Sequence, residues 1–164
     1  MQVKRIGAVV RRCAFALVCA CFVLAIEARA SDVAVRWKAG AFNDIKERIV
    51  FAIEGRGLVV NYTARVGAML ERTGGDIGAA KSVYANAEVI EFCSATISRA
   101  MMEADPHNIA QCPHTIAVYV LARERERVYV SYRRFATQGG TDATRRALQQ
   151  VEKLVADIVR EALE

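Results

Sequence analysis

Both cysteines and both histidines of the chain beyond residue 30 fall within one stretch of 22 residues. They are Cys93, His107, Cys112 and His114. Thiolate and imidazole groups are side chains that hold zinc, copper and haem iron in proteins. Thiols also form disulfides and, when deprotonated, act as nucleophiles. This stretch is therefore where the sequence places its capacity for chemistry.

The spacing of these four residues is compatible with three kinds of site. There is no C-x-x-C pair and no C-x-x-C-H sequence for haem attachment, so spacing alone assigns no cofactor. The first interpretation is a structural disulfide between Cys93 and Cys112, or two buried thiols. The second is a transition-metal or haem site that uses some of the four residues. The third is a reactive thiol, because Cys93 precedes a predicted helix whose N-terminus can lower a thiol pKa.

Hydrophobic periodicity predicts the elements that position these residues. Strands are expected at residues 33–37, 58–63, 88–93, 115–121 and 128–132, and helices at 42–54, 66–72 and 94–104. A closing amphipathic helix carries Leu148 to Ala162, with Thr141 as its N-cap. The charged residues 123–127 are expected at a solvated hairpin end. The predicted fold class is α+β, a single domain over residues 31–164 with a mostly antiparallel sheet packed against helices.

The direction of two strands decides whether the disulfide can form. Cys93 ends one predicted strand, and Cys112 lies just before the next. If the two strands are antiparallel, both cysteines lie at the same end of the sheet. If they are parallel, the cysteines lie about 17 Å apart, too far to bond. The intervening loop is long enough for either arrangement.

The first 30 residues have the organisation of an export signal. Basic residues precede an apolar run of 14 residues, Cys13 to Ile26, which is too short to span a membrane comfortably. Ala28 and Ala30 form a small-x-small cleavage pattern, with Ser31 as the expected new N-terminus. We therefore expect a periplasmic or secreted protein with no stable membrane anchor after cleavage.

Removal of this segment changes the charge of the protein. Five of the 23 basic residues and one of the 18 acidic residues lie in it, so residues 31–164 hold 18 and 17, a net charge of +1. The remaining charges of both signs are interspersed along the chain, so the sequence suggests no basic surface for a nucleic acid backbone. Nucleic acid is therefore not an expected partner.

Several short motifs resemble the bacterial family called domain of unknown function 302. They are GLVVNY at 57–62, VGAMLERT at 66–73, FCSA at 92–95, DPHNI at 105–109, CP at 112–113 and VSYRR at 130–134. The similarity extends over about residues 42–160 and is typical of exported members, in which a signal peptide precedes the domain. It implies a compact α+β domain and no defined activity. His114 departs from it, since an aromatic residue is expected after Cys112-Pro113.

We conclude from the sequence that the chain is a periplasmic binding or accessory domain centred on the Cys93/Cys112 segment. No catalytic residue is assigned, and the expected partner is a small ligand or another periplasmic protein. A metal- or haem-handling protein using Cys93, His107, Cys112 and His114 is one alternative. A thiol redox partner is the other.

Overall fold

Short strands and amphipathic helices alternate along the part of the chain that the structure describes. The structure is a computed structural model and describes residues 32–79, 81–135 and 140–164, which belong to one compact unit. The predicted signal peptide and its cleavage residues Ala28, Ala30 and Ser31 lie outside the described residues. No helix in the described ranges has the length and apolar character needed to cross a membrane.

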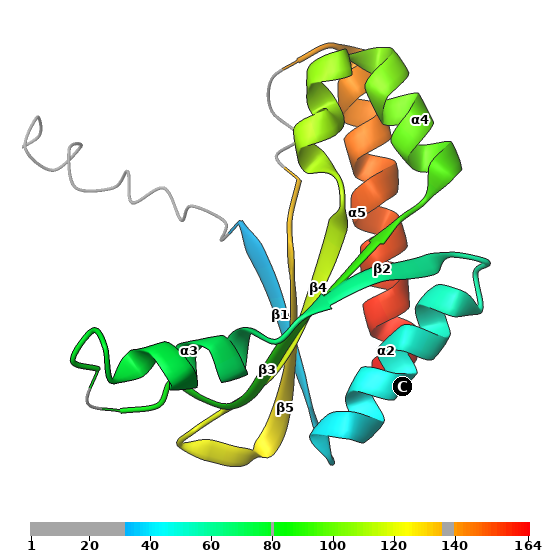
Figure 1. Ribbon diagram of the computed structural model, residues 1–164. Helices are drawn as coiled ribbons and strands as arrows, with labels where there is room; N and C mark the ends of the chain where they lie inside the picture. Colours follow the sequence, from blue (N-terminus) through cyan, green and yellow to red (C-terminus); the bar gives the residue numbers. More distant parts are fainter. Residues whose placement is uncertain (1–31, 80, 136–139) are drawn as a thin grey trace, which may run out of the picture. The chain divides into compact units, whose positions relative to one another are not determined.

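Five strands form one sheet in which every neighbouring pair is antiparallel (Figure 1). The strands lie in the order β1-β5-β4-β3-β2 across the sheet. Their bounds are β1 Val33–Ala39, β2 Val59–Ala64, β3 Tyr84–Cys93, β4 His114–Leu121 and β5 Glu124–Arg133. With this sheet and its helices the predicted α+β class is confirmed.

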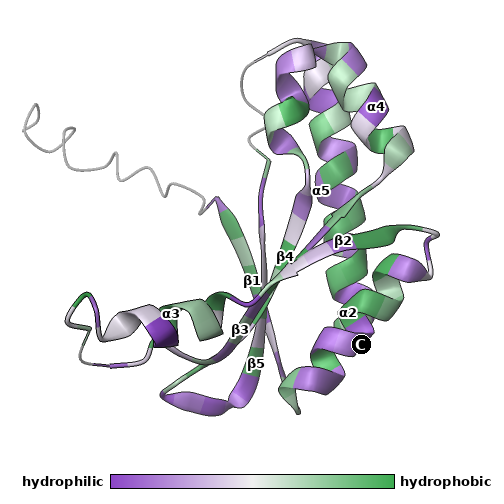
Figure 2. Cartoon of the chain, viewed as in Figure 1, coloured by the Kyte–Doolittle hydropathy of each residue, from purple (hydrophilic) through white to green (hydrophobic). Residues whose placement is uncertain are grey.

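Two long helices cover one face of the sheet. Helix α2 spans Phe42–Glu54 and helix α5 spans Asp142–Leu163, and they pack against each other and against β4 (Figure 1). Figure 2 shows apolar and polar residues alternating along α5, as expected for a helix with one buried side. The Thr141 hydroxyl accepts a hydrogen bond from the Thr144 backbone N–H, so the predicted N-cap is confirmed.

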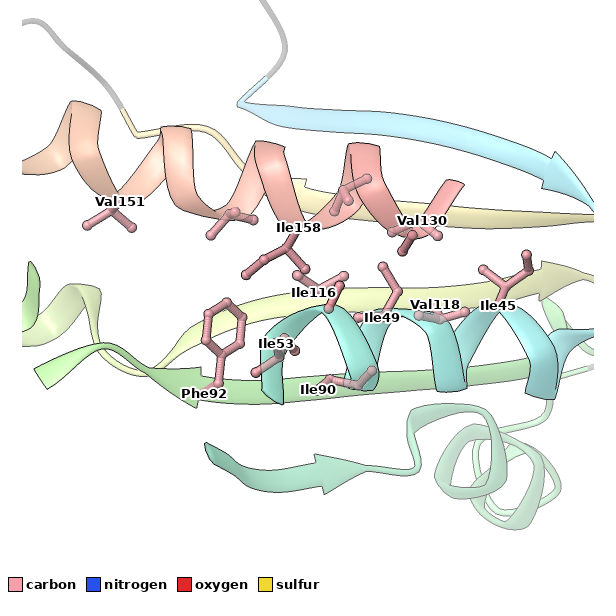
Figure 3. Packing of buried hydrophobic residues seen from close by; sticks show 14 of the residues in the cluster. Ile45, Ile49, Ile53, Ile90, Phe92, Ile116, Val118, Val130, Val151 and Ile158 are labelled. Atoms are coloured by element: carbon pink, nitrogen blue, oxygen red, sulfur yellow. The ribbon is translucent and has the colours of Figure 1, made fainter. Parts of the chain in front are cut away.

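The core fills the space between these helices and the sheet. Isoleucines at Ile45, Ile49 and Ile53 form one side of α2 and point toward strand residues such as Ile90 and Ile116 (Figure 3). All five are at most 2% exposed. Burial of one such side chain stabilises the fold by about 1.5–3 kcal/mol, so this layer holds the sheet in place.

Three shorter helices lie at the ends of the sheet. Helix α3, Val66–Gly74, packs against β3, where Gly67 approaches Ala87 so closely that an added Cβ would lie 2.8 Å from the Ala87 nitrogen. Helix α4, Ala95–Ala104, follows β3 and contacts α5. The 3-10 helix η1, Pro106–Gln111, then leads into β4.

Apart from shifts of one or two residues at element ends, the structure differs from the sequence prediction at the start of β3, before His114 and at the charged segment 123–127. Strand β3 begins at Tyr84 rather than at residue 88, and the predicted loop before His114 contains η1. Most of the charged segment 123–127 belongs to β5, because Leu121 already pairs with Glu124 and Arg127 pairs with Ala39 of β1. The hairpin end is therefore only Ala122 and Arg123.

Candidate functional site

Cys93 is held at the junction between β3 and α4. It is the last residue of β3 and pairs with Val59 of the edge strand β2. The next residue, Ser94, caps α4, and its side chain accepts a hydrogen bond from the Ile97 backbone N–H at 3.5 Å. The strand pairing and the cap together fix the position of the Cys93 thiol.

Cys112 reaches the same end of the sheet from the other direction. It ends η1 and precedes a cis peptide bond to Pro113. Strands β3 and β4 are antiparallel, with Phe92 paired to His114, so the arrangement that permits contact between the two cysteines is the one present. The Cys112 thiol donates a hydrogen bond to the Ser98 hydroxyl of α4 at 3.3 Å, and it also interacts with Cys93.

Cys93, Ser98 and Cys112 form a cluster that we call the thiol cluster. The sequence prediction did not include Ser98. Its position offered a signal, since it lies one helical turn after the N-cap Ser94, on the turn of α4 that follows Cys93. Both cysteines are half-buried and both are free thiols in the structure, so a Cys93–Cys112 disulfide stays a prediction.

The acidity of Cys93 is the opposite of what its place before a helix suggested. Burial raises the pKa of Cys93, and the neighbouring Cys112 side chain raises it further. The His114 backbone N–H and the Ser98 hydroxyl oppose this change by stabilising the thiolate, but they have less effect on the pKa. The reactive-thiol interpretation, which requires a lowered Cys93 pKa, is therefore not favoured by this environment, in which desolvation is the largest effect.

His114 faces the core and does not face the thiol cluster. Its side chain lies on the same helix-covered face of β4 as those of Ile116 and Val118, and it is 1% exposed. The edges of two aromatic rings flank its imidazole, Phe92 at 5.9 Å and Phe135 at 6.2 Å between centroids. Neither Nδ1 nor Nε2 makes a hydrogen bond of good geometry among the described residues. Burial lowers the pKa of His114, and a looser hydrogen bond with the Gln111 backbone opposes this change without reversing it, so the neutral ring is favoured at pH 7.

His107 lies apart from these groups. Its side chain is exposed on η1, and its backbone N–H donates to the Asp105 carboxylate at 2.9 Å. Within residues 32–79, 81–135 and 140–164, no three or more His, Cys, Asp or Glu side chains are placed to share a metal ion. The set Cys93, His107, Cys112 and His114 is thus not assembled here, because strand alternation turns His114 into the core while η1 leaves His107 at the surface.

A row of aromatic side chains lies on the other face of the sheet. Tyr119 stacks on Tyr129 at 5.4 Å and meets Tyr84 edge-on at 5.5 Å. Trp37 is 54% exposed, and the Arg127 guanidinium lies 4.6 Å from its ring centroid.

The antiparallel sheet with α2 and α5 on one face defines the chain as a small α+β protein. A family model described as "Domain of unknown function DUF302" matches residues 15–164, and the chain belongs to this family. It is similar in fold to the crystal structure of an uncharacterized conserved DUF302 protein from Bacillus stearothermophilus. The TM-score is 0.67 and the identity 15%, over 81% of this chain and 99% of that chain. None of the curated proteins matches this chain.

Proposed function

We propose that this DUF302 protein is an exported binding or accessory domain whose Cys93 and Cys112 thiols close into a disulfide in the periplasm. The observation that carries the proposal is the meeting of both thiols with Ser98 at one end of the sheet. Thiols that are neighbours in the folded chain need little movement to bond. The signal-like first 30 residues support an oxidising compartment, where such bonds persist.

A catalytic nucleophile is a poorer description of Cys93. The thiolate is the reactive form of cysteine, and a raised pKa keeps most of the side chain protonated near pH 7. Catalytic cysteines have the opposite property, a lowered pKa next to a cation or an exposed helix terminus. We therefore assign no catalytic activity to the thiol cluster.

A thiol redox partner is the second candidate, and the closeness of the two thiols favours it. In this function the two thiols give two electrons and two protons to the disulfide of an exported oxidant, which becomes a dithiol while the Cys93–Cys112 bond forms. A structural bond would have a reduction potential below about −300 mV, whereas a redox partner would lie at about −270 to −120 mV. Equilibration of the protein against glutathione buffers measures the reduction potential of the Cys93–Cys112 bond and so distinguishes the two functions.

A metal- or haem-handling role has weaker support. It would require ligands from Cys93, His107, Cys112 and His114 to meet, and their placement on the surface, at the junction and in the core separates them. Binding would then need η1 and the start of β4 to rearrange.

The test is the intact mass of protein purified from the periplasm and denatured without reductant, before and after treatment with iodoacetamide. We expect a chain that begins at Ser31 and takes up no alkyl group. Two alkyl groups on this chain would contradict the disulfide. A chain that retains residues 1–30 would contradict export with cleavage.

The matched control is Cys93→Ser, which leaves Cys112 without its partner. The variant is expected to take up one alkyl group, or to form a disulfide-linked dimer that dithiothreitol reduces to monomers. Reduced wild type must take up two groups, which establishes that denaturation exposes both thiols to the reagent.

A further inference from the structure

The thiol cluster offers two soft metal ligands side by side. The side chains of Cys93 and Cys112 interact with each other, and both interact with the Ser98 hydroxyl. Both cysteines are half-buried, so each keeps part of its surface open to solvent. Cys112 also packs against the hydrophobic core. The pair of thiols therefore lies between solvent and apolar atoms, within reach of a small ion.

The number of ligands limits which ion this pair can hold. The set of four ligands expected from the sequence is not assembled, and in the described part of the chain no third His, Cys, Asp or Glu side chain completes a site with the two thiols. Zinc in proteins takes three or four side-chain ligands. Cu(I) is a soft d¹⁰ ion that prefers thiolates, and two thiolates in a line satisfy it. Two thiols without a third ligand therefore favour Cu(I) over zinc.

The separation of the two sulfur atoms also suits an ion between them. A thiolate bond to a first-row metal ion is about 2.3 Å long, so two bonds in a line place the sulfurs about 4.6 Å apart. A disulfide holds them at about 2.05 Å. Free thiols in contact, as Cys93 and Cys112 are, lie within about 4.5 Å of each other. A small outward movement of one thiol therefore admits the ion.

Hydrogen-bond donors already point at the Cys93 sulfur. The His114 backbone N–H and the Ser98 hydroxyl both stabilise the thiolate form of Cys93. The N–H is held in place because His114 pairs with Phe92 across β3 and β4, and the hydroxyl is held by helix α4. Donors around a metal ligand fix its orientation and contribute about 10–100-fold to metal affinity. The cluster therefore supplies both the ligands and the groups that support them.

We propose that the reduced thiol cluster binds one Cu(I) ion between the sulfur atoms of Cys93 and Cys112. One ion enters and the two thiol protons pass to solvent, so no electron is transferred and the bound unit carries a single negative charge. The inference deepens the proposed binding function by naming its ligand, and it rests on that proposal for the role of the two thiols. The disulfide and the Cu(I) complex are alternative states of the same pair.

The probe is Cu(I) itself, added under nitrogen to reduced protein that competes with the chelator bathocuproine disulfonate. The three cysteines in residues 1–30 are first changed, as Cys13→Ala, Cys19→Ala and Cys21→Ala. Cys93 and Cys112 are then the only thiols, whether or not residues 1–30 are removed. We expect the protein to withdraw one equivalent of Cu(I) from the chelator. Copper X-ray absorption should show two sulfur neighbours and no histidine nitrogen.

Four variants test the placement of the ion. Cys93→Ser and Cys112→Ser should each weaken Cu(I) binding by at least about 100-fold, the upper end of the effect of changing a surrounding group. Ser98→Ala removes the hydroxyl that contacts both thiols and should weaken binding by about tenfold. His107→Gln is the control, because His107 is exposed on η1 outside the cluster, and it should leave binding within about twofold. X-ray absorption of the protein with both thiols keeps the test valid if a cysteine variant does not fold.

The inference is overturned if the chelator keeps all the Cu(I), if both serine variants bind as tightly as the parent, or if copper has nitrogen neighbours. Binding of Zn(II) as tightly as Cu(I) overturns it as well, because it would require ligands beyond the two thiols. These results would leave the disulfide proposal intact, since Cu(I) is added only after reduction. Two alkyl groups in the mass measurement would conversely contradict the disulfide and leave this inference intact.

Discussion

Replacement of His114 by phenylalanine is expected to stabilise the protein. The change removes two buried ring nitrogens that make no hydrogen bond of good geometry with the described residues. An unsatisfied buried polar group costs about 1–3 kcal/mol. Phenylalanine is larger, and overpacking costs a similar amount in a full core, but the adjacent hollow of about 150 Å³ can accept the extra volume. We therefore expect the free energy of unfolding to rise by about 1 kcal/mol at pH 7.5.

The stabilisation is expected to grow as the pH falls. Burial lowers the pKa of His114 in the folded protein, although a hydrogen bond from the Gln111 backbone opposes this change. The unfolded chain therefore takes up a proton first, below about pH 6.5. The stability of the wild type is complete above that pH and decreases below it, by up to about 1.4 kcal/mol between pH 7.5 and 5.5. His114→Phe lacks this loss, so its advantage becomes about 2 kcal/mol at pH 5.5.

Urea unfolding at the two pH values measures both effects. His107→Gln is the control, since it removes the other histidine from an exposed position and should change stability by no more than about 0.5 kcal/mol. Loss of stability in His114→Phe at pH 7.5, together with the same pH dependence as the wild type, would refute the reasoning. It would mean that the imidazole is hydrogen-bonded in solution.

Three further predictions concern the thiols and one helix contact. Closure of a Cys93–Cys112 bond across 18 intervening residues should raise the free energy of unfolding by about 3 kcal/mol over that of the reduced protein. Urea unfolding with and without dithiothreitol measures this difference, and equal values would argue against the bond. In the reduced native protein, the alkylation rate of Cys93, followed by peptide mass, should still rise above about pH 8.5, and a plateau below about pH 7.5 would contradict its raised pKa. Gly67→Ala should destabilise the protein by about 1–3 kcal/mol, because the added Cβ would meet Ala87. Gly75→Ala, where the added Cβ has open space, should be neutral or slightly stabilising. Equal effects of the two variants in thermal unfolding would show that α3 does not pack as described.

Helices and strands with strong periodicity were predictable from the sequence. Helix α2 has the predicted bounds, because isoleucines four residues apart at 45, 49 and 53 leave one side apolar and Gly55 follows its last residue. The start of β3 was not predictable, since Ala85 and Asn86 have low strand propensity. The strand is extended there by the pairing of Tyr84 and Asn86 with β4, and Ala85 lies in the register shift between them. Helix η1 was missed because six residues are too few to show a period.

The sequence alone determined that the thiols and histidines share one strand–helix–loop segment. It also determined that Cys93 and Cys112 could meet only if β3 and β4 were antiparallel. The tertiary structure decided that they are antiparallel, and it supplied Ser98 as the group between the thiols. Burial and the position of a cavity depend on residues that are distant in the chain. For that reason only the tertiary structure could show that burial raises the pKa of Cys93 and that His114 lies in the core.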